Sequence, residues 1–220
     1  MRHAVSLMAL PLLLLARIAA ADPAPLPDVI QKVQASYEAV RDLSAEFRQE
    51  THYEGFDTVV NSTGRLQIKK PGKLRWDYAE PTPNQVVVAD ERVWIYTPEQ
   101  KQVIVQPFAQ MSDSQMPLHL LTGSARLDQD FEVRRTTPAT DAKAIELTLV
   151  PRDAAAGLQK IEIRLDPKRY LITAVTLFES NGNRSAFEFN KIRTNTGLAD
   201  EVFVFKKPKG VELIENPLGK

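Results

Sequence analysis

Residues 66–78 have the sequence LQIKKPGKLRWDY, in which apolar and polar side chains alternate over two short runs. The runs are residues 66–69 and 73–78, and the Lys-Pro-Gly of residues 70–72 separates them. A period of two is typical of a strand with one apolar and one solvated face, and a Pro-Gly pair is typical of a turn. The stretch therefore predicts two antiparallel strands joined by a short turn.

The same alternation recurs along most of the chain. Parallel strands that are buried on both faces would be continuously apolar instead, so the pattern favours an antiparallel sheet. Pro, Asn and Gly separate the runs, and the Asn-Gly pair at residues 181–182 predicts a tight hairpin. We count about eleven candidate strands and predict a mainly β fold with some helix. Further runs are residues 44–48, 145–149, 160–165 and 187–189.

Two segments depart from this pattern. The first begins after the prolines at residues 23 and 25, where apolar side chains recur at helical spacing and predict an amphipathic helix. The second is the Met- and Leu-containing segment at residues 112–123, for which we expect one or two short helices inserted into the sheet sequence. The apolar positions of the first helix are Leu26, Val29, Ile30, Val33, Tyr37 and Val40.

A large sheet with one apolar face has to cover that face with helices or with a second sheet. The two helical segments supply little material for this purpose. We therefore expect a strongly curved sheet whose concave apolar face is incompletely filled. Such a surface is a candidate binding cavity.

Composition excludes several classes of function. The 220 residues include 28 Lys+Arg and 28 Asp+Glu, and the zero formal charge lacks the basic excess of a nucleic-acid-binding protein. Cysteine is absent, which removes disulfides, thiolate metal sites, cysteine nucleophiles and cysteine-linked lipid anchors. His52 and His119 have no metal-ligand spacing, and no nucleophile elbow, phosphate loop or dinucleotide fingerprint occurs. We expect no catalytic residues, no metal and no cofactor.

The N-terminus has the pattern of an export signal. A short basic start precedes an apolar run over residues 4–15, and three alanines at residues 19–21 suit a signal peptidase. The alternative, a membrane anchor, is disfavoured because the run is too short to span about 30 Å of hydrocarbon. We expect residues 1–21 to be a cleaved signal peptide and residues 22–220 to be one exported domain.

Three short motifs together resemble the periplasmic outer-membrane lipoprotein carrier family, LolA. They are FRQ at residues 47–49, KPGKLRWDY at residues 70–78 and VWIYTP at residues 93–98. Each motif alone is weak, but their combination in this order is specific. The resemblance extends over the whole chain.

The resemblance implies an incompletely closed antiparallel barrel of about eleven strands, with a strand at residues 203–205 that closes it. The hydrophobic cavity would be covered by an N-terminal helix and short lid helices. Such a protein is a monomeric periplasmic chaperone, not an enzyme. It receives acylated lipoproteins from an inner-membrane lipoprotein-releasing ABC transporter and delivers them to an outer-membrane receptor lipoprotein of the same fold. That receptor is anchored through a lipidated N-terminal cysteine. This chain contains no cysteine, so it resembles the carrier and not the receptor.

The resemblance also assigns roles to residues. Lys70, before Pro71, occupies the position of a basic residue that contacts the lid; the sequence alone indicates only a solvated charge at a strand end. The lid would contain Met116, Pro117, Leu118, Leu120 and Leu121. For the cavity residues the alternative is ordinary sheet core. The acyl-chain cavity would be lined by Phe47, Leu66, Ile68, Leu74, Trp76, Tyr78, Ile145, Leu147, Ile161, Ile163, Phe187 and Phe189.

Two other functions remain open at this point. One is a periplasmic regulatory module that senses lipids or lipoproteins on the same fold, although relatives of that kind usually carry a second domain. The other is a hydrolase of periplasmic lipids, which would show serine-dependent cleavage of acyl esters.

Overall fold

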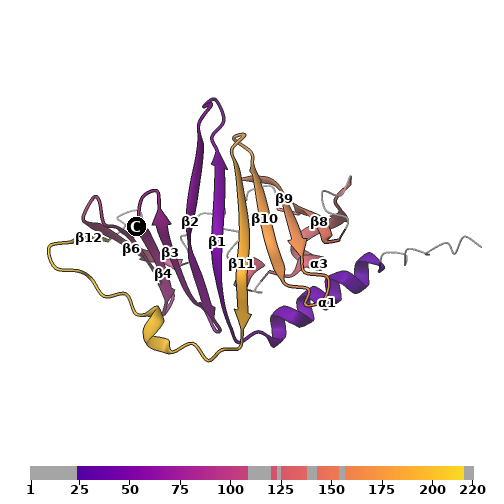
Figure 1. Cartoon of the computed structure of the whole chain (residues 1–220), viewed down its shortest axis with the longest axis horizontal. Helices are drawn as coiled ribbons and strands as arrows, with labels where there is room; N and C mark the ends of the chain where they lie inside the picture. Colours follow the sequence, from indigo (N-terminus) through magenta and orange to yellow (C-terminus); the bar gives the residue numbers. More distant parts are fainter. Residues whose placement is uncertain (1–23, 109–119, 123–124, 138–142, 154–156, 216–220) are drawn as a thin grey trace, which may run out of the picture.

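The computed structural model describes residues 24–108, 120–122, 125–137, 143–153 and 157–215. These residues form one twelve-stranded sheet that is open at both edges, with helix α1 (Leu26–Ala39) lying across one face (Figure 1). The strands are β1 (Asp42–His52), β2 (Val59–Lys69), β3 (Lys73–Glu80), β4 (Asn84–Ala89), β5 (Arg92–Thr97), β6 (Gln102–Pro107), β7 (Phe131–Arg135), β8 (Ile145–Pro151), β9 (Leu158–Leu165), β10 (Ile172–Glu179), β11 (Arg184–Thr194) and β12 (Glu212–Glu215). Two short helices are α3 (Leu127–Asp130) and η4 (Asp200–Phe203).

The strand order is β12-β6-β5-β4-β3-β2-β1-β11-β10-β9-β8-β7. Sequential antiparallel hairpins build each half, and the pairing of β1 with β11 joins the halves. The predicted antiparallel, incompletely closed sheet is thus confirmed. The twelfth strand, β12, is parallel to β6, which the sequence did not indicate.

The expected closing strand at residues 203–205 is wrong. Phe203 ends the 3-10 helix η4 and is buried, and residues 204–205 belong to no strand. This segment instead packs on the sheet, where the Phe205 ring lies 6.5 Å from Trp94 and 5.9 Å from Tyr96. Phe203 and Phe205 are two positions apart, as are neighbouring apolar residues on one face of a strand. Their spacing alone therefore did not distinguish a strand from an irregular segment.

Salt bridges hold this C-terminal segment to the sheet. The carboxylate of Asp200 lies 2.5 Å from Lys69 Nζ and 3.1 Å from Lys73 Nζ, and hydrogen bonds from these two lysines lower the pKa of Asp200. Arg75 Nη1 donates to the carbonyl of Val202 at 3.1 Å. We call the face of the sheet that carries Arg75 the outer face, and the face toward α1 the inner face.

The predicted amphipathic helix is confirmed as α1. Pro27 in its first turn costs no hydrogen bond, because those N–H groups have no helical partner, and Asp28 suits the positive end of the helix. The helix buries Val29, Val33 and Tyr37 against the inner face. None of the helices in the described ranges is long and apolar enough to cross a bilayer.

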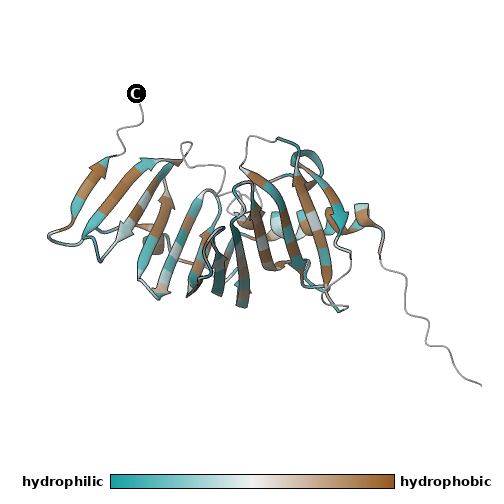
Figure 2. Cartoon of the chain, turned by 90° about the horizontal axis from the view of Figure 1, so that it is seen from above, coloured by the Kyte–Doolittle hydropathy of each residue, from teal (hydrophilic) through white to brown (hydrophobic). Residues whose placement is uncertain are grey.

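The alternation of the sequence appears directly on the strands, which carry successive hydrophobic and hydrophilic bands (Figure 2). One contiguous apolar core occupies the inner face and reaches from β5 across the sheet to β7 and β8. The predicted Asn-Gly hairpin joins β10 to β11, and Gly182 has the positive φ of 92° that such a turn requires.

Candidate functional site

The twelve residues predicted to line a cavity all belong to the inner-face core. The strand register explains this, because Phe47 is opposite Phe189, Leu66 is opposite Trp76, and Leu147 is opposite Ile163. Ten are buried, and Tyr78 and Ile145 are partly buried. All twelve therefore lie on the apolar face of the sheet, and their role as a cavity lining stays a prediction. Whether this surface is core, cavity or both depends on what covers it.

Five aromatic side chains form the centre of the inner face at β1, β3 and β11. The ring of Phe47 is 5.3 Å from that of Trp76 and 5.0 Å from that of Tyr78, in edge-to-face contacts. Phe187 lies 5.6 Å from Trp76 and 6.4 Å from Phe189. We call these five residues the aromatic cluster. Burial raises the pKa of Tyr78, so its hydroxyl stays protonated at neutral pH.

A glycine makes room for this cluster. A Cβ on Gly64 would lie 2.0 Å from the carbonyl oxygen of Asp77 and 2.7 Å from the ring of Phe47. The pairing of β2 with β3 shifts its register between Thr63 and Gly64. Only glycine lets the ring of Phe47 lie directly over the backbone of β2 at this position.

Helix α1, Leu120, Leu121 and α3 pack against the inner face. Leu120, Leu121 and Leu127 are each 4% exposed and belong to the core. A cavity of about 40 Å³ lies between α1, this segment and Ile172. A water molecule takes up about 30 Å³ in the liquid. Between α1 and this segment, the described part of the cover therefore leaves no room for an acyl chain unless α1 or the segment moves.

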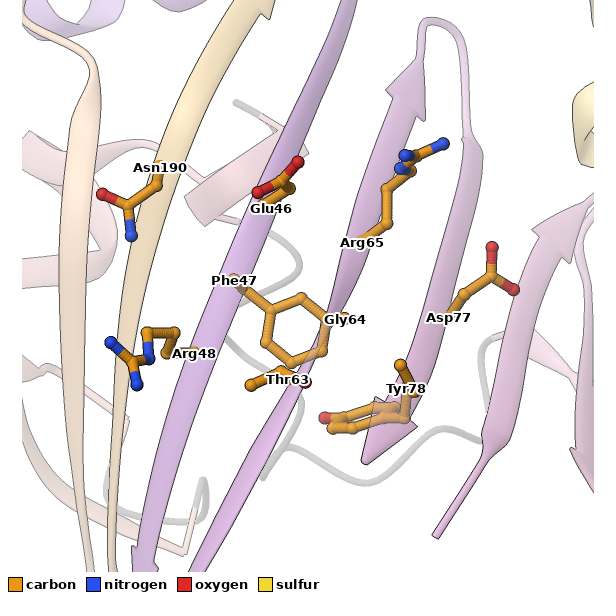
Figure 3. A pocket seen from close by; sticks show the side chains of 10 residues that line it. Glu46, Phe47, Arg48, Thr63, Gly64, Arg65, Asp77, Tyr78 and Asn190 are labelled. Atoms are coloured by element: carbon orange, nitrogen blue, oxygen red, sulfur yellow. The ribbon is translucent and has the colours of Figure 1, made fainter. Parts of the chain in front are cut away.

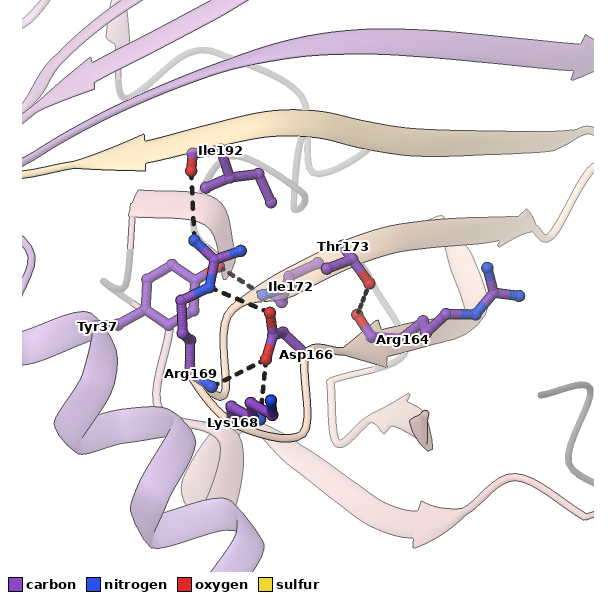
Figure 4. A network of polar contacts seen from close by, with 8 residues as sticks. All are labelled: Tyr37, Arg164, Asp166, Lys168, Arg169, Ile172, Thr173 and Ile192. Carbon is purple, nitrogen blue, oxygen red and sulfur yellow. Dashed lines mark hydrogen bonds and ion pairs between the residues drawn. The ribbon is translucent and has the colours of Figure 1, made fainter. Parts of the chain in front are cut away.

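Helix α1 is fastened at its C-terminal end by Tyr37. Its hydroxyl accepts a hydrogen bond from the Ile172 N–H at 3.2 Å, and burial raises its pKa above the usual range. The turn after β9 is shaped by Asp166, whose carboxylate accepts bonds from the N–H groups of Lys168 at 2.8 Å and Arg169 at 3.0 Å. Figure 4 shows this network beside α1. The sequence identified Tyr37 as apolar and gave no sign of its polar contact.

Lys70 contacts the same end of α1. Its Nζ donates to the carbonyl of Tyr37 at 2.5 Å, and this carbonyl, in the last turn of the helix, also accepts a hydrogen bond from the Val40 N–H at 3.2 Å. Burial lowers the pKa of Lys70, and the nearby charge of Glu38 opposes this change. The described contact is therefore to α1. Met116, Pro117 and Leu118 of the predicted lid lie outside the described residues.

The sequence did not reveal a groove of about 640 Å³ over β1, β2 and β3 (Figure 3). The register assigns most of its lining to the outer face, because these residues alternate with Phe47, Leu66 and Trp76. Acyl chains would have to desolvate this charged lining, so the groove is unsuited to them. Its lining consists of Glu46, Phe47, Arg48, Thr63, Gly64, Arg65, Asp77, Tyr78, Ala79 and Asn190.

Two comparisons of this sequence with known proteins point to one family. Residues 38–206 match the family model of the outer membrane lipoprotein carrier protein LolA. The chain is 32% identical over 177 residues to the outer-membrane lipoprotein carrier protein of Coxiella burnetii strain CbuK_Q154, covering 80% of this chain and 81% of that protein. It is 32% identical over 174 residues to the protein of the same name from Dechloromonas aromatica strain RCB, covering 79% and 81%.

A solved structure with a similar fold is that of an uncharacterized conserved protein from Thermus thermophilus. The TM-score is 0.57 at 12% sequence identity, and the match covers 86% of this chain and 98% of the other. At this identity the likeness concerns the fold alone.

Proposed function

The chain belongs to the LolA family of outer membrane lipoprotein carriers, and we propose that it holds the acyl chains of its lipoprotein cargo against the inner face of the sheet. The observation that carries this proposal is the position of the predicted lining. All twelve residues share the inner-face core, against which α1, Leu120, Leu121 and α3 pack. The outer groove, in contrast, has four charged residues in its lining, Glu46, Arg48, Arg65 and Asp77.

The physical requirement is the shielding of hydrocarbon from water. Each buried methylene contributes about 0.8 kcal/mol, so an anchor with several long acyl chains does not diffuse freely between membranes. In the closed protein the cover occupies the place that the chains would take. Acyl binding then exchanges one apolar contact for another, which allows tight binding without making release impossible.

Movement of α1 is the simplest way to open this surface. Its described polar contacts with the rest of the protein are few. They are the Tyr37 hydroxyl with Ile172, the Lys70 contact, a bond from Gln34 to Asp128 at 2.8 Å, an exposed contact from Lys32 to Tyr170 and a bond from Asn195 Nδ2 to the carbonyl of Ala39 at 3.2 Å. We propose that Lys70 helps to set the equilibrium between closed and open forms. Its single flexible ammonium group provides a weaker hold than the planar fork of an arginine would.

The remaining steps are also proposals. Residues 1–21 would direct export to the periplasm and be removed, leaving residues 22–220 as one domain. The protein would act there as a monomer. An inner-membrane lipoprotein-releasing ABC transporter would load it, and an outer-membrane receptor lipoprotein would unload it. Since the chain has no cysteine, it cannot itself carry a cysteine-linked lipid anchor.

The test is a transfer assay with purified protein and liposomes that contain a fluorescent triacylated lipoprotein and the releasing transporter. We expect ATP-dependent release of the lipoprotein into a soluble complex with this protein. Native mass spectrometry should then show one protein and one lipoprotein with its acyl chains intact. A lipoprotein that stays in the liposomes, or one that loses acyl chains on contact with the protein, would contradict the proposal.

A further inference from the structure

Two polar atoms of the inner face are buried without a hydrogen-bond partner among the described residues. They are the indole nitrogen Nε1 of Trp76 and the amide oxygen Oε1 of Gln49. The other end of the Gln49 amide is occupied, because its Nε2 donates to Thr51 Oγ1 at 2.9 Å. Trp76 as a whole is only 7% exposed. An unpaired donor and an unpaired acceptor thus remain on the inner face, beside the contact between the Thr51 and Ser185 hydroxyls at 3.4 Å.

Trp76 and Gln49 both lie next to Phe187, which belongs to the aromatic cluster. The rings of Trp76 and Phe187 are 5.6 Å apart, and Gln49 is directly opposite Phe187 in the register of β1 with β11. Gln49 is also near the end of β1, where the hairpin to β2 begins and Tyr53 is 47% exposed. Gln49 therefore lies between Phe47 and the hairpin, whereas Trp76, opposite Leu66 and level with Ala45, lies on the other side of Phe47.

Hydrocarbon cannot satisfy either atom, and burying a polar group without a partner is unfavourable. A ligand that satisfies both has to offer an acceptor to the indole N–H and a donor to the amide oxygen. A secondary amide has both groups, whereas an ester has only the acceptor. A charged ligand fits poorly, because the inner-face side chains of residues 43–51, 74–78 and 185–189 include no charged group.

We propose that Trp76 and Gln49 bind the amide linkage of an N-acylated lipid anchor. Trp76 Nε1–H donates to the amide carbonyl oxygen, and Gln49 Oε1 accepts from the amide N–H. The acyl chain then runs over the aromatic cluster, and the peptide leaves toward the β1–β2 hairpin. This assignment rests on the proposed function and adds a selection: the carrier distinguishes an acyl amide from an equally hydrophobic anchor that lacks the N–H.

The experiment uses two synthetic peptides that differ at one atom position. Each carries a palmitoyl chain on its N-terminal nitrogen, as a secondary amide in the first peptide and as an N-methyl amide in the second. Affinities for the purified protein are measured by isothermal titration calorimetry. One hydrogen bond is typically worth about a two- to tenfold change in affinity, so the wild-type protein should prefer the secondary amide by that factor.

Substitutions assign the preference to the two side chains. Gln49→Leu should bind both peptides equally, because it lacks the acceptor, and Trp76→Phe should weaken the binding of both by a similar factor. Matched controls are Gln67→Leu, at a position on the outer face of β2, and Trp94→Phe, at the contact with Phe205. Both controls should keep the wild-type affinities and the wild-type preference.

The outcomes separate this inference from the proposed function. A wild-type protein that binds both peptides equally overturns the inference and leaves acyl carriage intact. A preference that persists in Gln49→Leu also overturns it. A wild-type protein that binds neither peptide overturns the proposed function, and the inference with it. The comparison of the two peptides needs only the wild-type protein, so a variant that fails to fold does not remove the test.

Discussion

Replacing Tyr37 with phenylalanine should loosen the cover of the inner face. The substitution keeps the buried ring and removes the hydroxyl that accepts a hydrogen bond from the Ile172 N–H at 3.2 Å. Ile172 is 3% exposed, so its N–H would have no partner in the closed protein. Leaving a buried donor unpaired costs about 1–3 kcal/mol. When α1 moves away, water can reach the N–H, and the cost falls mainly on the closed form.

This magnitude corresponds to an increase of about five- to 150-fold in the population of the open form. Amide hydrogen exchange of α1, followed by mass spectrometry, measures that population if the helix exchanges by opening. We expect the protection of the helix centre, between Val33 and Tyr37, to fall by such a factor. Uptake of a fluorescent acyl probe should be faster in the same variant.

The matched control is Tyr170→Phe. The Tyr170 hydroxyl also contacts α1, where it accepts a hydrogen bond from Lys32 Nζ at 3.3 Å, but this contact is exposed. Exposed contacts contribute less than about 1 kcal/mol, so exchange in α1 should change little. If Tyr37→Phe and Tyr170→Phe behave alike, the Tyr37 hydroxyl does not hold the cover closed, and the reasoning is refuted.

Three further predictions concern other contacts that stabilise the fold or hold α1. Gly64→Ala should destabilise the fold by about 1–3 kcal/mol in urea unfolding, because the new methyl group would overlap a backbone carbonyl; unchanged stability would contradict the close approach. Asp42→Asn should reduce the loss of unfolding free energy that the wild type shows below about pH 4. Burial acts to raise the pKa of Asp42, but hydrogen bonds from Thr196 and Gly197 lower it overall. The stabilising contribution of Asp42 is therefore present at neutral pH and lost on acidification. If the unfolding free energies of the wild type and the variant run parallel across this pH range, this prediction is refuted. Lys70→Leu should change the rate of lipoprotein transfer to the receptor while thermal unfolding stays near that of the wild type, and an unaltered rate would exclude the proposed role of Lys70.

The period-two pattern predicted the inner face well because burial on one side imposes a strict alternation. Phe47, Trp76 and Phe187 are far apart in sequence, yet each lies on the apolar face that the alternation of its own strand indicates. The helix α1 and the hairpin at Gly182 were predicted from equally local signals.

Features that depend on distant pairing were not predictable in this way. β12 has four residues and pairs in parallel with β6, 110 positions earlier, so no local turn signals it. The C-terminal segment was interpreted as a strand because Phe203 and Phe205 are two positions apart. They have this spacing both in a paired strand and in an irregular segment that only packs its aromatic rings on the sheet. The outer groove, the hydrogen bond of Tyr37 and the unpaired atom of Trp76 arise from side chains of several elements and leave no pattern in one.

Photocrosslinking tests the central claim most directly. A triacylated lipopeptide with a photoreactive group in its acyl chain is bound to the purified protein and irradiated, and modified residues are assigned by fragment mass spectrometry. We predict adducts at alternate positions on the inner face, such as Ala45 and Phe47 of β1 and Leu74 and Trp76 of β3. Adducts at the intervening outer-face positions, or in the groove around Arg65, would contradict the account.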